Sequence, residues 1–191
     1  MNIQSDDKKQ RILDATMELI AENGLHATPM SQISKRSKVS AGTIYHYFSN
    51  KDELINYLYL ELKKEMFDAA FLGYDLPTPY QKRFLLIWRN TFNFLISRPK
   101  HLSLIEQCTT SPLISEEVQE KTNRYLATAL GFITEGIESG HLKKMDNQLI
   151  LSLMYGSILS TVKLQFAGDL EITDEHREAA ALFCWDGLKA N

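Results

Sequence analysis

The sequence predicts an all-α fold of about nine helices. Only 9 glycines and 5 prolines interrupt 191 residues, which favours long helices over many short strands. Apolar residues recur at spacings of three and four along most of the chain, as they do on one face of a helix. No stretch of useful length alternates apolar and polar residues in the manner of a half-buried strand.

Composition excludes several classes of protein. A hydrophobic content of 44% and a charged content of 24% are typical of a soluble globular chain. No apolar run reaches the ~18 residues of a membrane span, and the N-terminus lacks the apolar core of a signal peptide. We therefore expect a cytoplasmic protein without a membrane partner.

Metal and cofactor sites are not expected either. The two cysteines, Cys108 and Cys184, form neither a metal-binding spacing nor a disulfide framework. The histidines at 101, 141 and 176 are too widely separated to suggest ligation. A buried, inert thiol is the simplest interpretation of Cys108, and a redox-sensing role is the alternative.

The net charge of −3 conceals an asymmetry. Residues 1–51 carry seven basic and five acidic side chains, whereas the remainder carries fourteen basic and nineteen acidic ones. A mildly basic N-terminal part on an acidic body is compatible with one phosphate-facing end.

Periodicity and its interruptions place the helices in order. The first runs from about Lys8 to the Asn23-Gly24 stop. Thr28 is expected to cap the second, with Pro29 at its first helical position, and Ser40 to cap a short third. Later helices are expected at about 51–72, 80–97, 100–109, 115–139, 147–167 and 173–189.

The short third helix has an unusual outer face. On a 3.6-residue wheel, Ile44 and Phe48 form its buried stripe. The other side presents small, polar and aromatic residues, namely Gly42, Thr43, Tyr45 and His46. We interpret residues 1–50 as a DNA-binding head with a helix-turn-helix motif at about 29–48, and residues 51–191 as a ligand-binding and dimerisation domain. The alternative is a solvated face of a small helical bundle.

The two terminal helices suggest a dimer interface. The helix at 147–167 is apolar nearly all round, with a seam of small residues at Gly156, Ser157 and Ser160. The helix at 173–189 is also largely apolar. Two such helices favour an isologous four-helix contact between two copies, and core packing inside one subunit is the alternative.

Residues 11–67 resemble the head of the tetracycline-repressor (TetR) family. A first helix ending in a Gly turn and a Thr-capped second helix lead to the block VSAGTIYHYFSNKDEL. The matching positions are Val39, Ser40, Gly42, Thr43, Tyr45, Tyr47, Phe48, Lys51 and Leu54. The resemblance covers about the first third of the chain.

The resemblance implies a homodimer that binds double-stranded DNA at a palindromic operator, with each third helix in a major groove. Its phosphate contacts would be Thr28, Tyr47 and Lys51. The residues that face the groove would be Ser40, Ala41, Gly42, Thr43, Tyr45 and His46, with Ser31 and Gln32 at its edge. Lys38 departs from the pattern, since this turn position is usually glycine; a left-handed conformation here costs roughly 1 kcal/mol. Its charge would face the phosphates.

By the same resemblance, an unknown small-molecule effector would bind between the fourth and seventh helices. Aromatic and polar residues are the candidates for its pocket, namely Trp88, Phe92, Glu106, Gln107, Tyr125, Phe132 and Tyr155. A semi-buried Glu106 would favour a cationic ligand. Each aromatic residue is also compatible with an ordinary place in the core.

The sequence thus predicts a ligand-responsive transcriptional regulator, most simply a repressor that its effector releases from DNA. An activator of the same fold and a helical protein-interaction adaptor are the alternatives. An enzyme is not expected, because the sequence holds no nucleophile–base arrangement, metal motif or phosphate loop.

Overall fold

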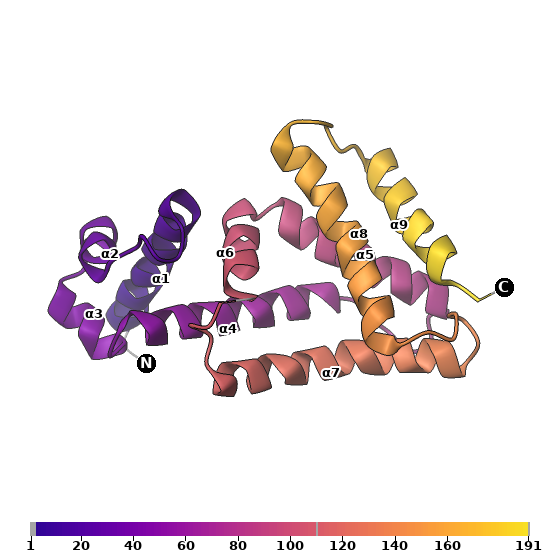
Figure 1. Ribbon diagram of the computed structural model, residues 1–191, viewed down its shortest axis with the longest axis horizontal. Coiled ribbons are helices and arrows are strands. Elements are labelled where there is room, and N and C mark those ends of the chain that lie inside the picture. The colour runs from indigo at the N-terminus through magenta and orange to yellow at the C-terminus, as the bar shows by residue number, and fades with distance from the viewer. Residues whose placement is uncertain (1–2, 110, 191) are drawn as a thin grey trace. The chain divides into compact units, whose positions relative to one another are not determined.

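The computed structural model describes residues 3–109 and 111–190, without the side chains of residues 3–6. Throughout these residues, the regular secondary structure is helical (Figure 1), which confirms the predicted fold class. The helices are α1 (Ile3–Asn23), α2 (Met30–Ser37), α3 (Ala41–Tyr47), α4 (Lys51–Ala70), α5 (Tyr80–Ile96), α6 (Pro99–Thr109), α7 (Glu116–Glu138), α8 (Asn147–Ala167) and α9 (Asp174–Leu188).

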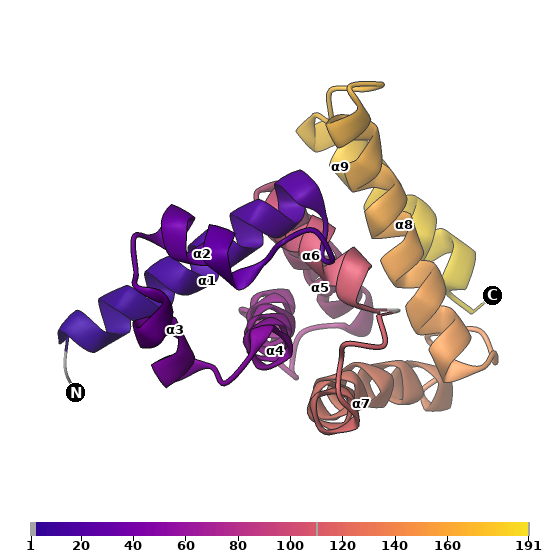
Figure 2. The ribbon, with the colours of Figure 1, turned by 60° about the vertical axis from the view of Figure 1, so that its left-hand side comes forward.

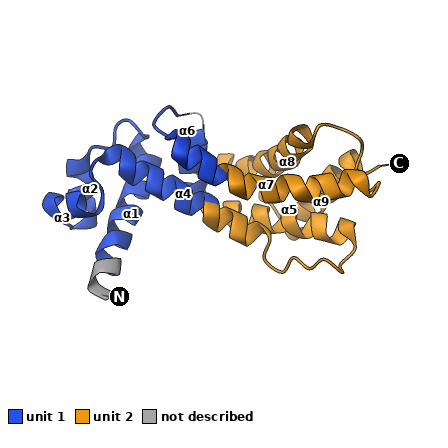
Figure 3. Cartoon of the chain, turned by 90° about the horizontal axis from the view of Figure 1, so that it is seen from below, with its two compact units in different colours: residues 1–63, 99–122 blue, residues 64–98, 123–191 orange. Residues whose placement is uncertain are grey.

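The helices pack into two compact units (Figure 3). Unit 1 comprises residues 1–63 and 99–122, and unit 2 comprises residues 64–98 and 123–191. The domain boundary expected from the sequence lies at residue 50, whereas unit 1 continues to residue 63 and also includes α6. Helix α6 belongs to unit 1 because it packs on α1. Helices α4 and α7 each contribute residues to both units.

Aliphatic side chains form the core of unit 1. The first four helices contribute six that are fully buried, namely Ile12, Ile20, Ile33, Ile44, Leu54 and Ile55. Each contributes about 1.5–3 kcal/mol relative to an exposed position. Arg36 of α2 also pairs with Glu22 of α1 at 2.7 Å, but both side chains are exposed. Such a pair contributes little, so the apolar core holds this unit together.

Unit 2 is organised around the aromatic stripe of α5. Phe84, Trp88 and Phe92 are buried, as their spacing predicts. The Trp88 indole Nε1 donates to the Ser157 hydroxyl of α8 at 2.9 Å, so the one polar atom of the ring is satisfied. Helix α5 contacts both α8 and α9, which lie side by side (Figure 2).

A buried arginine joins α5 to α7. The Arg83 guanidinium donates to the carboxylate of Glu135, to the Tyr74 hydroxyl and to the Thr78 carbonyl. This pairing lowers the pKa of the Glu135 carboxyl. A guanidinium is tolerated in the interior when its donors are satisfied in this way. Beside it, the Tyr80 ring of α5 stacks on the Phe132 ring of α7, with ring centroids 4.5 Å apart.

Two helix boundaries differ from the expected ones, the end of α4 and the start of α1. Helix α4 ends at Ala70 rather than Leu72, and the Asn90 amide donates to the carbonyls of both residues. These bonds satisfy acceptors that the end of a helix leaves open. Helix α1 begins at Ile3, before the expected start at Lys8.

Helix α8 is long and apolar enough to cross a bilayer by composition, and it is the one such helix in the residues described. One row of its side chains, Ile150, Met154, Ile158 and Val162, is buried inside the protein. Several of its other apolar side chains are exposed, including Leu149, Leu153, Leu164 and Phe166. One face of the helix therefore packs into the core, while apolar side chains on its other side are exposed to solvent.

Candidate nucleic-acid interface

Helix α3 is short, but both of its ends are capped. The Ser40 side chain accepts from the Thr43 N–H at 3.2 Å, as predicted, and the Phe48 N–H donates to the Ile44 carbonyl at 2.9 Å. Ile44 and Phe48 are buried, so they attach the helix to the core of unit 1. Capping and two buried anchors fix which side of this two-turn helix faces outward.

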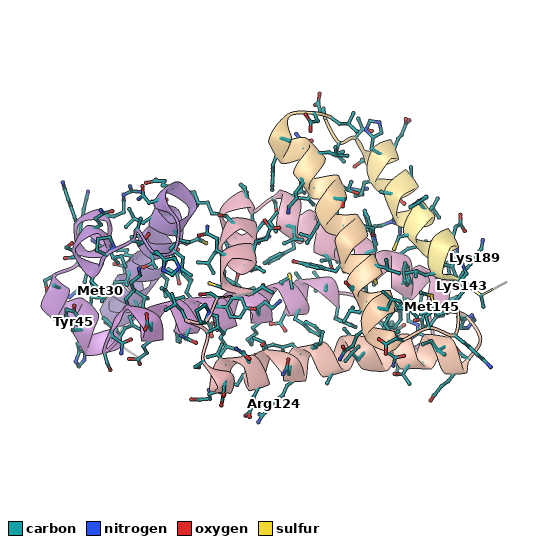
Figure 4. The ribbon with its side chains drawn as sticks, in the orientation of Figure 1. Met30, Tyr45, Arg124, Lys143, Met145 and Lys189 are labelled. Atoms are coloured by element: carbon teal, nitrogen blue, oxygen red, sulfur yellow. The ribbon has the colours of Figure 1, made fainter. Side chains whose placement is uncertain are left out.

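The outward side carries the expected groove-facing residues. Ser40, Ala41, Gly42, Tyr45 and His46 are exposed, and Thr43 and Tyr47 are half-buried. The Tyr45 side chain is 52% exposed, which is high for an aromatic ring. In Figure 4 it lies at the same end of unit 1 as Met30 of α2. Ser31 and Gln32 of α2 are also exposed.

The turn before α3 contains the strained residue. Lys38 adopts φ 55° and ψ 33°, the left-handed conformation anticipated at this position. Its peptide is held in place by Arg11 of α1, whose guanidinium donates to the Ser37 carbonyl at 2.6 Å and to the Lys38 carbonyl at 3.2 Å. That Arg11 holds this turn could not be predicted, because its partner, the Ser37 carbonyl, lies 26 residues away in the sequence.

We expect Lys38→Gly to stabilise the protein and weaken its binding to DNA. Removing the left-handed strain should raise the free energy of unfolding by about 0.5–1 kcal/mol. If the ammonium contacts a phosphate, its loss should reduce the log–log salt slope of binding by about one. Thermal unfolding and salt-dependent binding titrations measure the two effects. Lys38→Arg is the control that keeps both charge and strain, and an unchanged salt slope for Lys38→Gly would contradict the phosphate contact.

Two of the expected phosphate contacts, Thr28 and Lys51, donate hydrogen bonds to backbone carbonyls within unit 1. Thr28 is buried, and its hydroxyl donates to the Gly24 carbonyl at 2.9 Å instead of capping α2. Pro29 is the N-cap residue of α2, and no side chain caps that end. The Lys51 ammonium donates to the carbonyls of Leu25 and His26, and burial lowers its pKa. In this conformation both side chains hold the loop before α2.

That loop is also held from α6. The Gln107 side chain accepts from the Leu25 N–H at 2.9 Å, while Lys51 donates to the carbonyl of the same residue at 2.7 Å. The Leu25 residue is thus fixed through both its backbone groups, by side chains from α4 and α6. Gln107 is also a candidate ligand contact, and in this structure its amide oxygen accepts the hydrogen bond from Leu25 in the loop before α2.

The remaining candidate ligand residues are distributed over both units. Glu106 is exposed on α6 in unit 1, which removes the semi-buried acid on which a cationic ligand depended. In unit 2, Trp88 stacks on Phe92 with ring centroids 5.6 Å apart. Phe132 stacks on Tyr80, Tyr125 lies against Phe67 with centroids 5.8 Å apart, and Tyr155 is half-buried on α8. The aromatic candidates therefore also serve the packing of unit 2.

Cys108 lies in a fully buried position on α6. Burial raises the pKa of its thiol to about 12, so the reactive thiolate is scarce at neutral pH. This environment favours the inert thiol over the redox sensor.

A capped, outward-facing helix behind a tight turn has the form of a helix-turn-helix motif, in which the second helix contacts DNA. The family model described as bacterial regulatory proteins of the tetR family matches residues 12–58. A second model, described as a tetracyclin repressor-like C-terminal domain, matches residues 79–189. The chain therefore belongs to the TetR family.

Relatives and solved structures agree with this assignment. The fatty acid metabolism regulator protein of Bacillus subtilis is 29% identical over 163 residues, which cover 83% of this chain and 84% of that protein. An uncharacterized helix-turn-helix regulator of the same organism is 30% identical over 78% of this chain and 80% of its own length. A TetR family regulator from Marinobacter aquaeolei is 26% identical and superposes with a TM-score of 0.93 over 100% of both chains. These relatives are transcription regulators, and the family is not one of enzymes.

Proposed function

We propose that the protein is a homodimeric repressor that binds a palindromic operator and is released from it by a small-molecule effector. The observation that carries the proposal is the outer face of α3, where exposed polar and aromatic residues stand on a helix fixed by two buried anchors. A major groove admits one α-helix, and its base edges offer partners to such side chains. Two copies of the head would then read two half-sites.

The uncovered apolar face of α8 and α9 supports the dimer. Large apolar side chains on the two helices are exposed, namely Leu149, Leu153, Leu164, Phe166, Leu182 and Phe183. Phe183 alone is 79% exposed. Large exposed apolar side chains gathered on two neighbouring helices are typical of an association surface. A Cβ atom at Gly156 would meet nothing within 4 Å, and Ser160 is exposed, so a second helix pair could approach this seam closely.

Phe183→Asp is expected to dissociate the dimer. An aromatic anchor at the centre of an interface is typically worth about 2 kcal/mol or more, so the dimer should weaken by at least about 30-fold. Sedimentation equilibrium measures the change. Leu76→Asp is the matched control, because Leu76 is 70% exposed in the loop between α4 and α5, outside the proposed interface. Equal effects of the two variants would contradict this interface.

Release by an effector follows from linkage. If the effector prefers a conformation whose two heads do not match the operator, effector and DNA weaken each other's binding by the same factor. Helix α4 starts at the head and continues into unit 2, so it is the covalent path along which the proposal carries this signal. The name of the Bacillus subtilis relative makes genes of fatty acid metabolism the first operators to test.

The experiment is a mobility-shift titration with DNA that flanks the protein's own gene, followed by transcription in vitro from the promoter found there. Repression predicts a salt-sensitive, sequence-preferring shift and a fall in transcript when protein is added. A rise in transcript would assign an activator. Binding without sequence preference would contradict the proposal, and absence of any DNA binding would favour the protein-interaction adaptor.

A further inference from the structure

A lysine stands on the buried side of α4. Ile55, Tyr59 and Leu62 line that side, and each is almost fully buried. Lys63 follows one turn after Tyr59 and is itself half-buried. Lysines on amphipathic helices normally occupy the solvated face, so a cation at this position is unusual.

The Lys63 ammonium has no acidic partner among the residues that the structure describes. Within the residues described, no carboxylate lies within ion-pairing distance of it, and the ammonium lies over the Tyr59 ring, whose centroid is 5.8 Å from Nζ. That distance is at the outer limit of a cation–π contact. The neighbouring Lys64 is different, because it is exposed and pairs with Asp68 at 2.8 Å.

The surroundings of Lys63 in unit 1 do little to stabilise its charge. Tyr59 is buried, and the Thr109 side chain of α6 lies near its hydroxyl. The thiol of Cys108, which lies close to Tyr59, is fully buried, and burial raises its pKa. Burial lowers the pKa of Lys63, as expected for an ammonium that has lost water without gaining a counter-charge. An incoming anion would supply that counter-charge in an apolar setting, where ion pairs are strong.

We propose that Lys63 binds the anionic head group of an amphiphilic effector. This proposal rests on the ligand response proposed above and specifies its chemistry. The proposed ligand is an anion, whereas a semi-buried Glu106 favoured a cation; the Glu106 side chain is exposed in the structure. The head group is a carboxylate or a phosphate ester, since both are anions of the size that an ammonium pairs with.

The test compares two fluorescent dyes that differ mainly in charge, 8-anilinonaphthalene-1-sulfonate and neutral N-phenyl-1-naphthylamine. Lys63→Met keeps the length and apolar stem of the side chain and removes its charge. We expect the sulfonate dye to bind at least about 10-fold more weakly, since charge-assisted pairs contribute about 1.5–3 kcal/mol. The neutral dye should change by less than about twofold, because apolar contacts are conserved in this substitution.

Two further variants exclude trivial explanations. Lys63→Arg keeps the charge and should retain binding of the sulfonate dye. Lys64→Met removes the same charge from the next residue on the exposed side of the helix and should leave both dyes unaffected. Circular dichroism establishes that each variant is folded. Equal weakening of both dyes by Lys63→Met, or an equal effect of Lys64→Met on the sulfonate dye, would overturn the proposal.

Displacement of the sulfonate dye identifies the head group. Preferential displacement by dodecanoate assigns a carboxylate, and preferential displacement by dodecyl phosphate assigns a phosphate ester. Displacement by neutral methyl dodecanoate to the same extent as by both acids would overturn the proposal. These measurements contain no DNA, so they stand apart from the repressor proposal. A protein that binds anions through Lys63 but keeps its operator would contradict only the ligand-controlled release.

Discussion

Replacing Tyr45 by alanine is expected to weaken operator binding by about 5- to 150-fold, the loss of one good base contact at about 1–3 kcal/mol. Fluorescence anisotropy with labelled operator measures the change. The tyrosine ring is 52% exposed on the outer face of α3, where it can meet a thymine methyl group in the major groove. Since the side chain contributes little to the core, the unfolding temperature should change by at most a few degrees.

Tyr45→Phe separates the ring from its hydroxyl. If the ring makes the contact, the phenylalanine variant should retain most of the affinity; if the hydroxyl donates to a base, it should lose as much as alanine. Ile44→Ala provides the opposite control, because Ile44 is fully buried and its truncation should cost about 2–5 kcal/mol of stability. A Tyr45→Ala protein that unfolds like Ile44→Ala would show that the faces of α3 are wrongly assigned.

Gly136→Ala is expected to destabilise unit 2 by about 1–3 kcal/mol, the usual cost of forcing an extra methyl group into a packed core. A Cβ atom at this position of α7 would lie 2.2 Å from the Tyr80 hydroxyl oxygen and 2.8 Å from a methyl carbon of Leu142. Tyr80 is buried, and its hydroxyl donates to the Phe132 carbonyl at 2.9 Å. The ring therefore cannot move away without breaking that bond and its stacking on Phe132.

Gly131→Ala on the same helix is the matched control. A Cβ atom there would meet nothing within 4 Å. Alanine is favoured over glycine in a helix by about 1 kcal/mol, so this variant should be more stable than the parent protein. Thermal and denaturant unfolding should therefore move in opposite directions for the two substitutions. Shifts of the same sign would contradict the close packing of Tyr80 on Gly136.

The features that could be predicted from the sequence depend on neighbouring residues. The cap at Ser40 and the buried stripe of Ile44 and Phe48 follow from local spacing, and the structure confirms them. The left-handed Lys38 could be anticipated because it stands at a turn position where glycine is usual. The burial of Phe84, Trp88 and Phe92 on α5 follows in the same way from their spacing of four residues.

The features that could not be predicted depend on contacts between distant segments. Gln107 lies 82 residues from the backbone N–H of Leu25 that it holds, and nothing local to α6 indicates that partner. Lys51 reads as a solvent-facing cation at the start of a helix, yet carbonyls 25 and 26 residues earlier bind its ammonium. The lack of an acidic partner for Lys63 among the described residues likewise depends on where the acidic groups of distant segments lie.

We propose that two copies of the α3 face read an inverted repeat in DNA. Selection from a random-sequence duplex library, with the intact protein and sequencing of the bound DNA, tests it most directly. The account predicts enrichment of an inverted repeat whose half-site centres lie about 34–36 Å apart, one DNA turn, or a multiple of it. Tyr45→Ala should lose that enrichment. Recovery of a single unrepeated half-site, or of no preferred sequence, would contradict the account.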